Sequence, residues 1–460
     1  MSDTSTSSPP SEPRSEGSTQ ARLEALRAKV QRALGTGSRA PMEEPRGAVK
    51  GAAGAARGAA VTARREAGEG IERRWPFTPR ETPSGVLEAA RADYAEGHRV
   101  GEVPLGPAAS AVPALLALLA LDPSLSRLDP RRALFLDTET TGLSKGAGTV
   151  AFLVGLARWS GPSLELEQLL LADFASEAAM LEHVRRRLDE ASFVVSFNGK
   201  SFDLPLLRGR AVMARVGALP ERPHLDLLHV ARRIHGRRIG STTLRALEEQ
   251  VLGMRRVGDV AGEEVAACYF QWLRSKDPEE LLPVVQHNAL DVLSMVALVG
   301  LYGEPLSSQD PGASTARAPA PSEQLHPDDV AGAARVLARA GELALAEAYV
   351  EASLSRGGGV PALSLRGDLA KARGDKSRAL RDYEAALERA TTGGSPRERG
   401  LGERHAAELR LALAKLYEHH ARDVERALST LEAPTTEPSA LHTRRVERLL
   451  AKRGATKPRA

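Results

Sequence analysis

Hydrophobic and polar positions first follow the pattern of strands. Residues 133–139 (ALFLDTE) predict a strand, and residues 149–159 and 164–174 predict two more after turns that contain Gly and Pro. Helical spacing in residues 176–191 predicts a helix with Ser176 as its N-cap, and residues 193–198 (FVVSFN) predict a fourth strand. The first three strands suggest an antiparallel meander, and the whole series predicts an α/β sheet.

Helical patterns dominate after the fourth strand. They cover residues 202–216, 225–236, 242–253, 263–275 and 278–303, and these helices are expected to pack on the sheet. The apolar run at 111–121 (AVPALLALLAL) is about half as long as a membrane span and contains Pro113. We interpret it as a buried helix or core segment and expect a soluble protein without membrane contact.

Shifts in composition predict four regions. Residues 1–77 are expected to be disordered, because their Gly/Ala/Arg-rich stretch at 47–70 cannot bury a core. That stretch is either a plain linker or a weak contact for nucleic acid. Residues 78–305 form the globular region, residues 306–325 are a linker rich in Ser, Pro, Ala and Gly, and residues 326–455 are helical.

The helical region repeats itself. Residues 338–354 match residues 371–387, and Gly341, Ala346 and Leu354 align with Gly374, Ala379 and Leu387. A weaker third copy at 419–433 places Ala427 in register with Ala379. A period near 34 is typical of stacked helix–turn–helix repeats and resembles tetratricopeptide (TPR) repeats, though without the Trp of that family. An irregular helical bundle is the alternative.

Charge and cysteine content change the picture little. The chain has 63 Lys and Arg against 59 Asp and Glu, a net charge of +4, so any basic patch for nucleic acid must be local. One cysteine, Cys268, excludes an internal disulfide and a thiolate zinc site, which fits a cytoplasmic location. The first residues lack the pattern of a signal peptide.

Acidic residues gather at the predicted ends of elements. Asp137 and Glu139 lie two positions apart and share one face of a strand, Asp203 follows a strand and loop, and Asp291 lies on a helix, one turn after His287. Four carboxylates that converge repel one another unless cations lie between them. Oxygen ligands favour two Mg²⁺ or Mn²⁺ ions, which could clamp a phosphoryl group in a two-metal reaction.

The ordered segments FLDTETTGL, FNGKSFDLPLL and HNALD resemble the DEDD exonucleases of the RNase H-like superfamily. With GAGTVAFLVGLA, HLDLLHVARRIHG and TLRALEEQVLG they are similar to the bacterial YprB-type subfamily, over about residues 100–305. The resemblance implies an RNase H-like mixed sheet flanked by helices, followed here by the TPR-like helical region.

The same resemblance implies roles for the site residues. Asp137 and Glu139 would bind metal, Asp203 would bind the second ion, and Asp291 would complete the set. His287 would be the general base, a role that suits its ordinary pKa. It combines the histidine of one branch of the family with the spacing of the other, with three residues between it and Asp291, and a structural histidine is the alternative.

Several further residues are candidates with two interpretations each. Asn198, Thr138 and Thr140 could contact substrate or stabilise turns, and an arginine cluster could hold phosphates or form a solvated helix end. This cluster consists of Arg232, Arg233, Arg237 and Arg238. We expect Asp226 to be structural, and Phe197 and Phe202 to lie in the core.

The leading prediction is a metal-dependent 3′–5′ exonuclease that acts on single-stranded DNA or RNA. One alternative is a scaffold or nucleic-acid-binding protein with an inactive nuclease fold, and another is an endonuclease of the same fold. The helical repeats are predicted to dock a protein partner.

Overall fold

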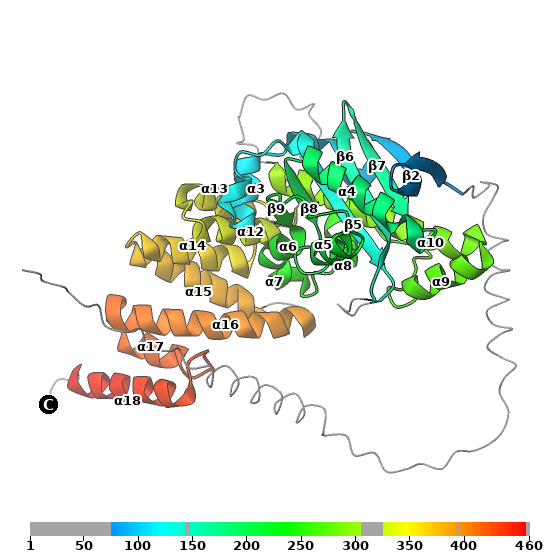
Figure 1. Ribbon diagram of the computed structural model, residues 1–460. Coiled ribbons are helices and arrows are strands. Elements are labelled where there is room, and N and C mark those ends of the chain that lie inside the picture. Colours follow the sequence, from blue (N-terminus) through cyan, green and yellow to red (C-terminus); the bar gives the residue numbers. More distant parts are fainter. Residues whose placement is uncertain (1–74, 143–147, 305–324, 393–395, 457–460) are drawn as a thin grey trace, which may run out of the picture. The chain divides into compact units, whose positions relative to one another are not determined.

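A seven-stranded mixed sheet organises the first half of the structure (Figure 1). The computed structural model describes residues 75–142, 148–304, 325–392 and 396–456. Neighbouring strands follow the order β1-β2-β7-β6-β5-β8-β9. Their bounds are β1 (Thr78–Thr82), β2 (Gly85–Ala95), β5 (Ala133–Thr140), β6 (Ala151–Ser160), β7 (Ser163–Leu170), β8 (Phe193–Ser196) and β9 (His224–Asp226). Two short strands, β3 (Arg99–Val100) and β4 (Val103–Pro104), pair with each other.

The predicted meander is confirmed. Strand β6 pairs antiparallel with both β5 and β7, and the fourth predicted strand, β8, lies parallel to β5 on its other side. The pairing of β5 with β6 shifts register between Glu139 and Thr140, and Asp137 lies opposite Gly155. The acidic end of β5 is therefore near the middle of the sheet.

Three strands of this sheet were not predicted. Strand β2 reads GVLEAARADYA, and its alanines and charged residues hide the alternation of a strand, although it pairs with β7 from Glu88 to Ala95. Strand β1 pairs only with β2, at the edge. Strand β9 has three residues and runs directly into a helix, so the helical periodicity of the following residues masked it.

Side chains of β5 point alternately into two hydrophobic cores. Leu134 and Leu136 belong to the core that helices α4 and α5 cover, whereas Ala133 and Phe135 belong to the core under α3, α6 and most of α10. Because the alternation continues, Asp137 and Glu139 are expected on the α10 face of the strand and Thr138 on the other. The polar contacts of these residues, described below, agree with this.

Helices cover both faces of the sheet (Figure 1). Their bounds are α3 (Pro113–Ala120), α4 (Glu177–Glu190), α5 (Asp203–Met213), α6 (Leu227–Ile234), α7 (Gly236–Ile239), α8 (Leu244–Leu247), α9 (Val265–Ser275) and α10 (Pro278–Gly303). A π-helical turn, η5 (Glu248–Leu252), follows α8. The apolar run at 111–121 forms α3, as expected. Ser176 occupies the N-cap of α4, but its side chain makes no capping hydrogen bond.

Helix α10 is long and apolar enough to cross a membrane by length and composition alone. It packs on β5 and β6, and 72% of its most apolar window is buried inside the protein. Core helices of soluble proteins meet the same criterion. Its apolar character is therefore explained by contact with the sheet.

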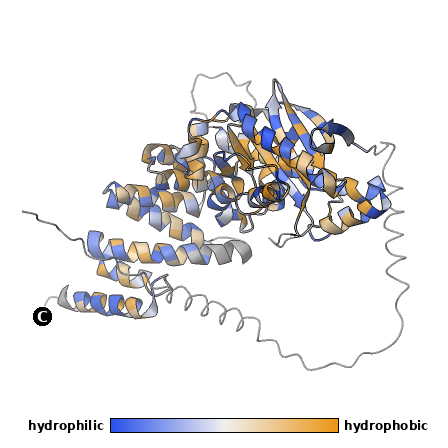
Figure 2. Cartoon of the chain, in the orientation of Figure 1, coloured by the Kyte–Doolittle hydropathy of each residue, from blue (hydrophilic) through white to orange (hydrophobic). Residues whose placement is uncertain are grey.

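The C-terminal helices form consecutive helix pairs, and hydrophobic and hydrophilic residues alternate along them (Figure 2). Their bounds are α12 (Pro327–Arg339), α13 (Leu343–Ser355), α14 (Val360–Ala372), α15 (Lys376–Thr392), α16 (Pro396–Leu416), α17 (Val424–Thr430) and α18 (Ser439–Thr456). A second π-helical turn, η6 (Tyr417–Ala421), follows α16. Strong pairing of α12 with α13 and of α14 with α15 matches the predicted helix–turn–helix repeat.

The backbone supports the predicted register of all three copies. Ala346, Ala379 and Ala427 are completely buried. Five residues before each lies a left-handed turn residue, namely Gly341 (φ 91°), Gly374 (φ 87°) and Arg422 (φ 56°). Glycine adopts this conformation without strain, which explains its recurrence in the first two copies. The assignment of these repeats to the TPR family stays a prediction.

Helix α12 packs directly against α6, so the predicted helical region begins on the core of the sheet region. Gly332 of α12 faces Ile234, and a Cβ at this position would collide with the Ile234 carbonyl oxygen. Close by, the carboxylate of Asp329 lies 3.0 Å from His235 Nδ1 and 2.6 Å from Arg238 Nη2. His235 and Asp329 are both completely buried, and His235 Nε2 lies 2.9 Å from the Tyr302 hydroxyl.

Parts of the predicted regions lie outside the described residues. This applies to residues 1–74 of the predicted disordered region and to nearly all of the predicted linker 306–325. Of the first region, Phe77 is buried in the core and Trp75 stacks on Trp272 at 5.4 Å. Leu325, the last predicted linker residue, belongs to the core shared with α12. The predicted domain boundaries stay a prediction.

Gly332→Ala is expected to destabilise the protein by about 1–3 kcal/mol, because the added methyl group forces α12 away from α6. Gly209→Ala in α5 is a matched control, since its Cβ would meet nothing within 4 Å. Helix propensity should make that variant neutral or slightly more stable. Urea unfolding of both variants checks the prediction, and equal stability of the two would contradict it.

Candidate active site

The structure brings the four predicted carboxylates into one electrostatic cluster. Asp137 and Glu139 lie on β5, Asp203 is the first residue of α5, and Asp291 lies in α10. Burial raises the pKa of Asp137 well above its ordinary value, and the charges of Asp291, Glu139 and Asp203 raise it further. Segments 66 and 88 residues apart therefore meet at the end of β5.

The other three carboxyl groups show the same effect. Burial is the largest cause in each, and it raises the pKa of Glu139 to about 7 and that of Asp203 to about 6. The pKa of Asp291 is also raised, although Arg256 and His287 oppose the shift. Because burial and repulsion disfavour the ionised form of these acids, a bound cation would stabilise their carboxylates.

An amide relay fixes Asp137. Asn288 Nδ2 donates to Asp137 Oδ2 at 2.9 Å, and Gln168 Nε2 in turn donates to Asn288 Oδ1 at 2.9 Å. Asn288 is completely buried, and it fits only because residue 155 is glycine, since a Cβ there would collide with its Oδ1. The relay holds one oxygen of Asp137 in place and leaves the other for a ligand.

His287 faces the cluster through one nitrogen and a fifth acid through the other. Its Nδ1 lies 2.7 Å from Asp259 Oδ1, and its Nε2 lies 3.7 Å from Asp291 Oδ2 and 4.0 Å from Glu139 Oε1. Asp259 as a carboxylate would accept from Nδ1–H and leave Nε2 of the neutral ring as an acceptor, whereas Arg256 Nη1, 3.1 Å from the same Nδ1, can only donate and suits the other tautomer. Burial lowers the pKa of His287, but Asp291, Asp259 and Glu139 outweigh burial and raise it.

Arg256 neutralises part of this charge. Its guanidinium donates to Glu248 and to Asp291 Oδ1, and its Nη1 lies 3.1 Å from His287 Nδ1. Burial lowers the pKa of Arg256, but the two acids raise it above its ordinary value and keep the side chain charged. In the part of the chain that the structure describes, no group of three or more His, Cys, Asp and Glu side chains is arranged to hold a metal ion.

The donor set nevertheless suits a hard divalent ion. It consists of carboxylate oxygens, with one imidazole beside them, and these are the ligands that Mg²⁺ and Mn²⁺ prefer. Asp137, Glu139, Asp203 and Asp291 are the residues that would hold it. Their mutual repulsion is the observation that favours such an ion.

The two threonines next to the acids have different partners. Thr138 Oγ1 donates to Asp203 Oδ1 at 2.5 Å, on the face of β5 opposite Asp137. Thr140 Oγ1 donates to the carbonyl oxygen of Gly142 at 3.0 Å and so stabilises the turn. Thr138 positions an acid, whereas the contact of Thr140 is that of a turn residue.

Asn198 lies in the loop that leads into Asp203 and has a left-handed φ of 70°. Its backbone nitrogen donates to Asp226 Oδ1 at 2.8 Å, and Lys200 N donates to Asp226 Oδ2 at 3.1 Å. Asp226 also caps α6 through the backbone nitrogen of Leu228. These contacts agree with the structural role expected for Asp226.

The structure does not bring Arg237 and Arg238 to the carboxylates. Arg238 pairs with Asp329 of α12, and Arg237 Nη1 lies 3.2 Å from His405 Nε2 of α16. Within the described ranges, neither arginine forms an ion pair with a predicted metal ligand. Their predicted phosphate contact therefore gains no support, because Arg238 has a structural partner instead.

Phe202 was expected in the core, but its side chain is 48% exposed beside Asp203. It is the last residue before α5, where the chain turns toward solvent. Phe197 is partly buried and packs against the core, as expected.

A hollow of about 560 Å³ lies beside the same loop. It is lined by Phe197, Asn198, Leu228, Arg232 and residues 240–244. Three consecutive hydroxyl residues, Ser241, Thr242 and Thr243, and the guanidinium of Arg232 give it a polar, cationic character. Of the predicted arginine cluster, Arg232 is thus the member next to a cavity that could take a phosphate.

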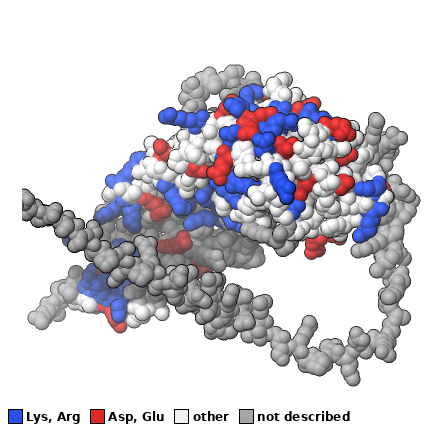
Figure 3. Space-filling view, in the orientation of Figure 1, with Lys and Arg blue, Asp and Glu red and all other residues white. Residues whose placement is uncertain are grey.

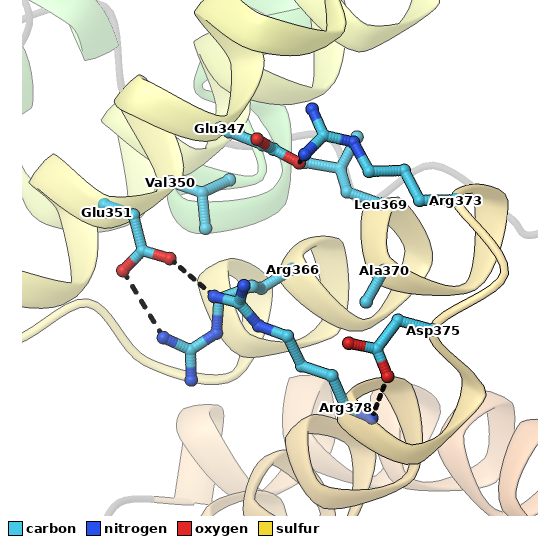
Figure 4. A pocket seen from close by; sticks show the side chains of 9 residues that line it. All are labelled: Glu347, Val350, Glu351, Arg366, Leu369, Ala370, Arg373, Asp375 and Arg378. Carbon is cyan, nitrogen blue, oxygen red and sulfur yellow. Dashed lines mark hydrogen bonds and ion pairs between the residues drawn. The ribbon is translucent and has the colours of Figure 1, made fainter.

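A second hollow of about 350 Å³ lies between α13, α14 and α15 (Figure 4). Its charged side chains pair with one another: Glu351 bonds to Arg366 and Arg378, and Arg373 lies 2.7 Å from Glu347. These contacts identify no ligand. The docking of a protein partner by the helical region stays a prediction.

Charges of both signs are interspersed over the face shown in Figure 3. This agrees with the small net charge of the chain. A nucleic acid would therefore depend on local contacts rather than on one broad basic surface.

The family comparison decides the type of domain. A model described as the RNase H superfamily matches residues 134–302, the range that contains all four acids and His287. Residues 134–302 form an RNase H superfamily domain. This RNase H-like domain comprises β5 to β9 and helices α4 to α10, and it confirms the predicted fold class. Its superfamily is one of nucleases.

Part of the chain is also similar to a curated protein. The chain is 38% identical over 166 residues to the uncharacterized protein YprB of Bacillus subtilis (strain 168), an alignment that covers 36% of this chain. It covers 40% of the relative, so the chain spans about two fifths of that protein. Among solved structures, the family B DNA polymerase of Pyrobaculum calidifontis is similar at 18% identity, over 45% of this chain and 29% of the polymerase. Its TM-score of 0.27 is too low for an inference.

Sequence reasoning missed Arg256, Asp259, Glu248 and Asn288. Asn288 lies inside the HNALD segment, and its place next to His287 was a usable signal. Arg256 and Asp259 lie in the irregular segment between η5 and α9. No helix or strand periodicity there predicts where a side chain points. Only the three-dimensional contacts identify them.

In metal-free protein, Glu139→Gln is expected to remove a pH-dependent loss of stability. The pKa of Glu139 rises from 4.5 to about 7 on folding, so its favourable contribution is present below pH 4.5 and is lost as the pH rises through about 7. The variant should gain stability over wild type across this window, on the order of 3 kcal/mol. Urea unfolding in EDTA at several pH values tests this, and a difference that stays constant with pH would contradict it.

Proposed function

We propose that the protein is a metal-dependent 3′–5′ exonuclease that hydrolyses phosphodiester bonds of single-stranded DNA or RNA. One observation carries the proposal: four carboxylates and a histidine converge at the end of the central strand of an RNase H-like domain. The direction of digestion and the preference for single strands rest on the resemblance of the three acidic segments to DEDD exonucleases.

Two divalent ions would supply charge stabilisation to the attacking and leaving oxygens of the phosphoryl group. The chain contributes the ligands Asp137, Glu139, Asp203 and Asp291 and keeps them oriented. Asn288 fixes Asp137, and Thr138 fixes Asp203. A site oriented before the substrate arrives loses little energy to rearrangement during the reaction.

His287 would accept the proton of the attacking water. In the tautomer with the proton on Nδ1, the ring would donate to Asp259 and direct Nε2 toward Glu139 and Asp291. An imidazole held in one tautomer by a carboxylate is a common arrangement for a general base. The spacing to Asp291, which differs from that of related histidine enzymes, places both residues on one face of α10.

The hollow lined by Asn198, Arg232 and Thr242 would hold part of the strand next to the scissile bond. It borders the loop that leads into Asp203. Hydroxyl and guanidinium groups suit phosphate and sugar oxygens.

An inactive scaffold is less well supported. A binding protein without turnover gains nothing from carboxyl groups that disfavour their own charge, and such a cluster costs stability. An endonuclease of the same fold would use the same acids, so only the form of the substrate distinguishes it.

Asp137→Asn is expected to lower Mn²⁺-dependent digestion of a 5′-labelled single-stranded oligonucleotide by about 100-fold or more. The amide keeps the size of the side chain and removes the charge. Wild type should give a ladder that shortens from the 3′ end, and EDTA should abolish it. DNA and RNA are compared in parallel, and a circular single strand should stay intact.

Undiminished cleavage by Asp137→Asn would refute the proposed site. Cleavage of the circle would favour the endonuclease. Binding of the oligonucleotide without product in Mg²⁺ and Mn²⁺ would favour the scaffold.

Asp259→Asn is expected to lower turnover by about 10- to 100-fold with little change in Mn²⁺ affinity. The amide no longer offers His287 Nδ1 a charged acceptor, so the ring is no longer held in one tautomer. A double-mutant cycle provides the control, since Asp259 also lies 3.5 Å from Arg256. In a His287→Ala background the same substitution should have almost no further effect. Full additivity of the two losses would show that Asp259 does not act through His287.

A further inference from the structure

Arg256 is held next to the carboxylate cluster by an ion pair with Glu248. Its side chain is 3% exposed, and it reaches the site from the irregular segment between η5 and α9. Nε lies 2.7 Å from Glu248 Oε2 and Nη2 lies 2.5 Å from Glu248 Oε1, which is a bidentate pair. The same Nη2 also contacts Asp291 Oδ1.

No second arginine or lysine among the described residues forms an ion pair with the four carboxylates. Arg256 does so through Asp291. The remaining cationic partner is His287, which is charged only when protonated. Four acids, of which Asp203 is buried and the others are partly buried, therefore share one permanent positive charge.

The two acidic partners of Arg256 differ in burial and in their expected role. Glu248 is completely buried and receives a second hydrogen bond from Ser294 Oγ at 2.7 Å. Asp291 is 19% exposed and belongs to the cluster that would bind metal. The pair with Glu248 would keep the guanidinium in place if Asp291 turned to another cation, since an Arg bound to a buried acid is costly to separate.

We propose that Arg256 is an internal counter-cation that occupies Asp291 in the metal-free protein and competes with the divalent ion for this carboxylate. The inference rests on the proposed function, because it assumes that Asp291 binds metal. Arg256 thereby sets the metal affinity of the site. In the metal-free protein its charge offsets part of the repulsion within the acidic cluster until an ion arrives.

A competing cation and a metal-orienting residue have opposite effects on affinity. Removal of a competitor leaves Asp291 unpaired and should tighten metal binding. Removal of a residue that only orients Asp291 should weaken it. A residue that only stabilises the fold should leave it unchanged.

The test is calorimetric titration of the full-length protein with Mn²⁺ at neutral pH. The variant E248Q/R256M removes both charges, so that no buried Glu248 is left without a partner, and E248Q alone is its reference. Arg255→Met is the matched control, because it removes the same charge from the exposed neighbour. We expect the double variant to bind Mn²⁺ at least tenfold more tightly than E248Q, and Arg255→Met to bind like wild type.

Equal or weaker binding by the double variant would overturn the inference. Should the double variant fail to fold, Arg256→Lys replaces it, because an ammonium group cannot bridge both acids, and it should bind Mn²⁺ more tightly than wild type. Equal or weaker binding by that variant would overturn the inference as well. Absence of Mn²⁺ binding in wild type would instead refute the proposed function, and the inference with it, so the two failures are distinguishable.

Discussion

Repulsion among buried carboxylates is the constraint on which the rest of the site depends. Asp137 and Glu139 share a face because they lie two positions apart on β5, and α10 and α5 bring Asp291 and Asp203 to the same strand end. Burial and mutual repulsion both oppose the simultaneous ionisation of these acids. The neighbouring side chains fit this constraint: Asn288 and Thr138 donate hydrogen bonds, Arg256 contributes a charge, and His287 lies between two acids.

Much of this arrangement could be predicted from the sequence, because strong local patterns specify it. The meander of β5, β6 and β7 follows from three apolar segments separated by turns, and the alternation of β5 predicts which face carries Asp137. Strand β2 was missed because tertiary pairing with β7, rather than local hydrophobicity, makes it a strand. The helical repeat was recognised from its glycines and buried alanines, and the turn at Arg422 follows the same register.

The remainder depends on contacts that no local pattern encodes. Arg256 and Asp259 come from an irregular segment, and their directions are set by Glu248 and His287. Arg238 looked like a phosphate ligand in a basic stretch, but a buried acid on α12 pairs with it. Charged residues in sequence are thus ambiguous until their partners are known, whereas acids that converge on one strand end have few explanations other than a bound cation.

The most direct test of this account is a crystal structure with Mn²⁺, located by its anomalous scattering. The account predicts that Mn²⁺ is bonded to carboxylate oxygens of the four acids, Asp137, Glu139, Asp203 and Asp291, with Arg256 retained on Glu248. Mn²⁺ bound elsewhere, with Asp291 still paired with Arg256, would contradict it.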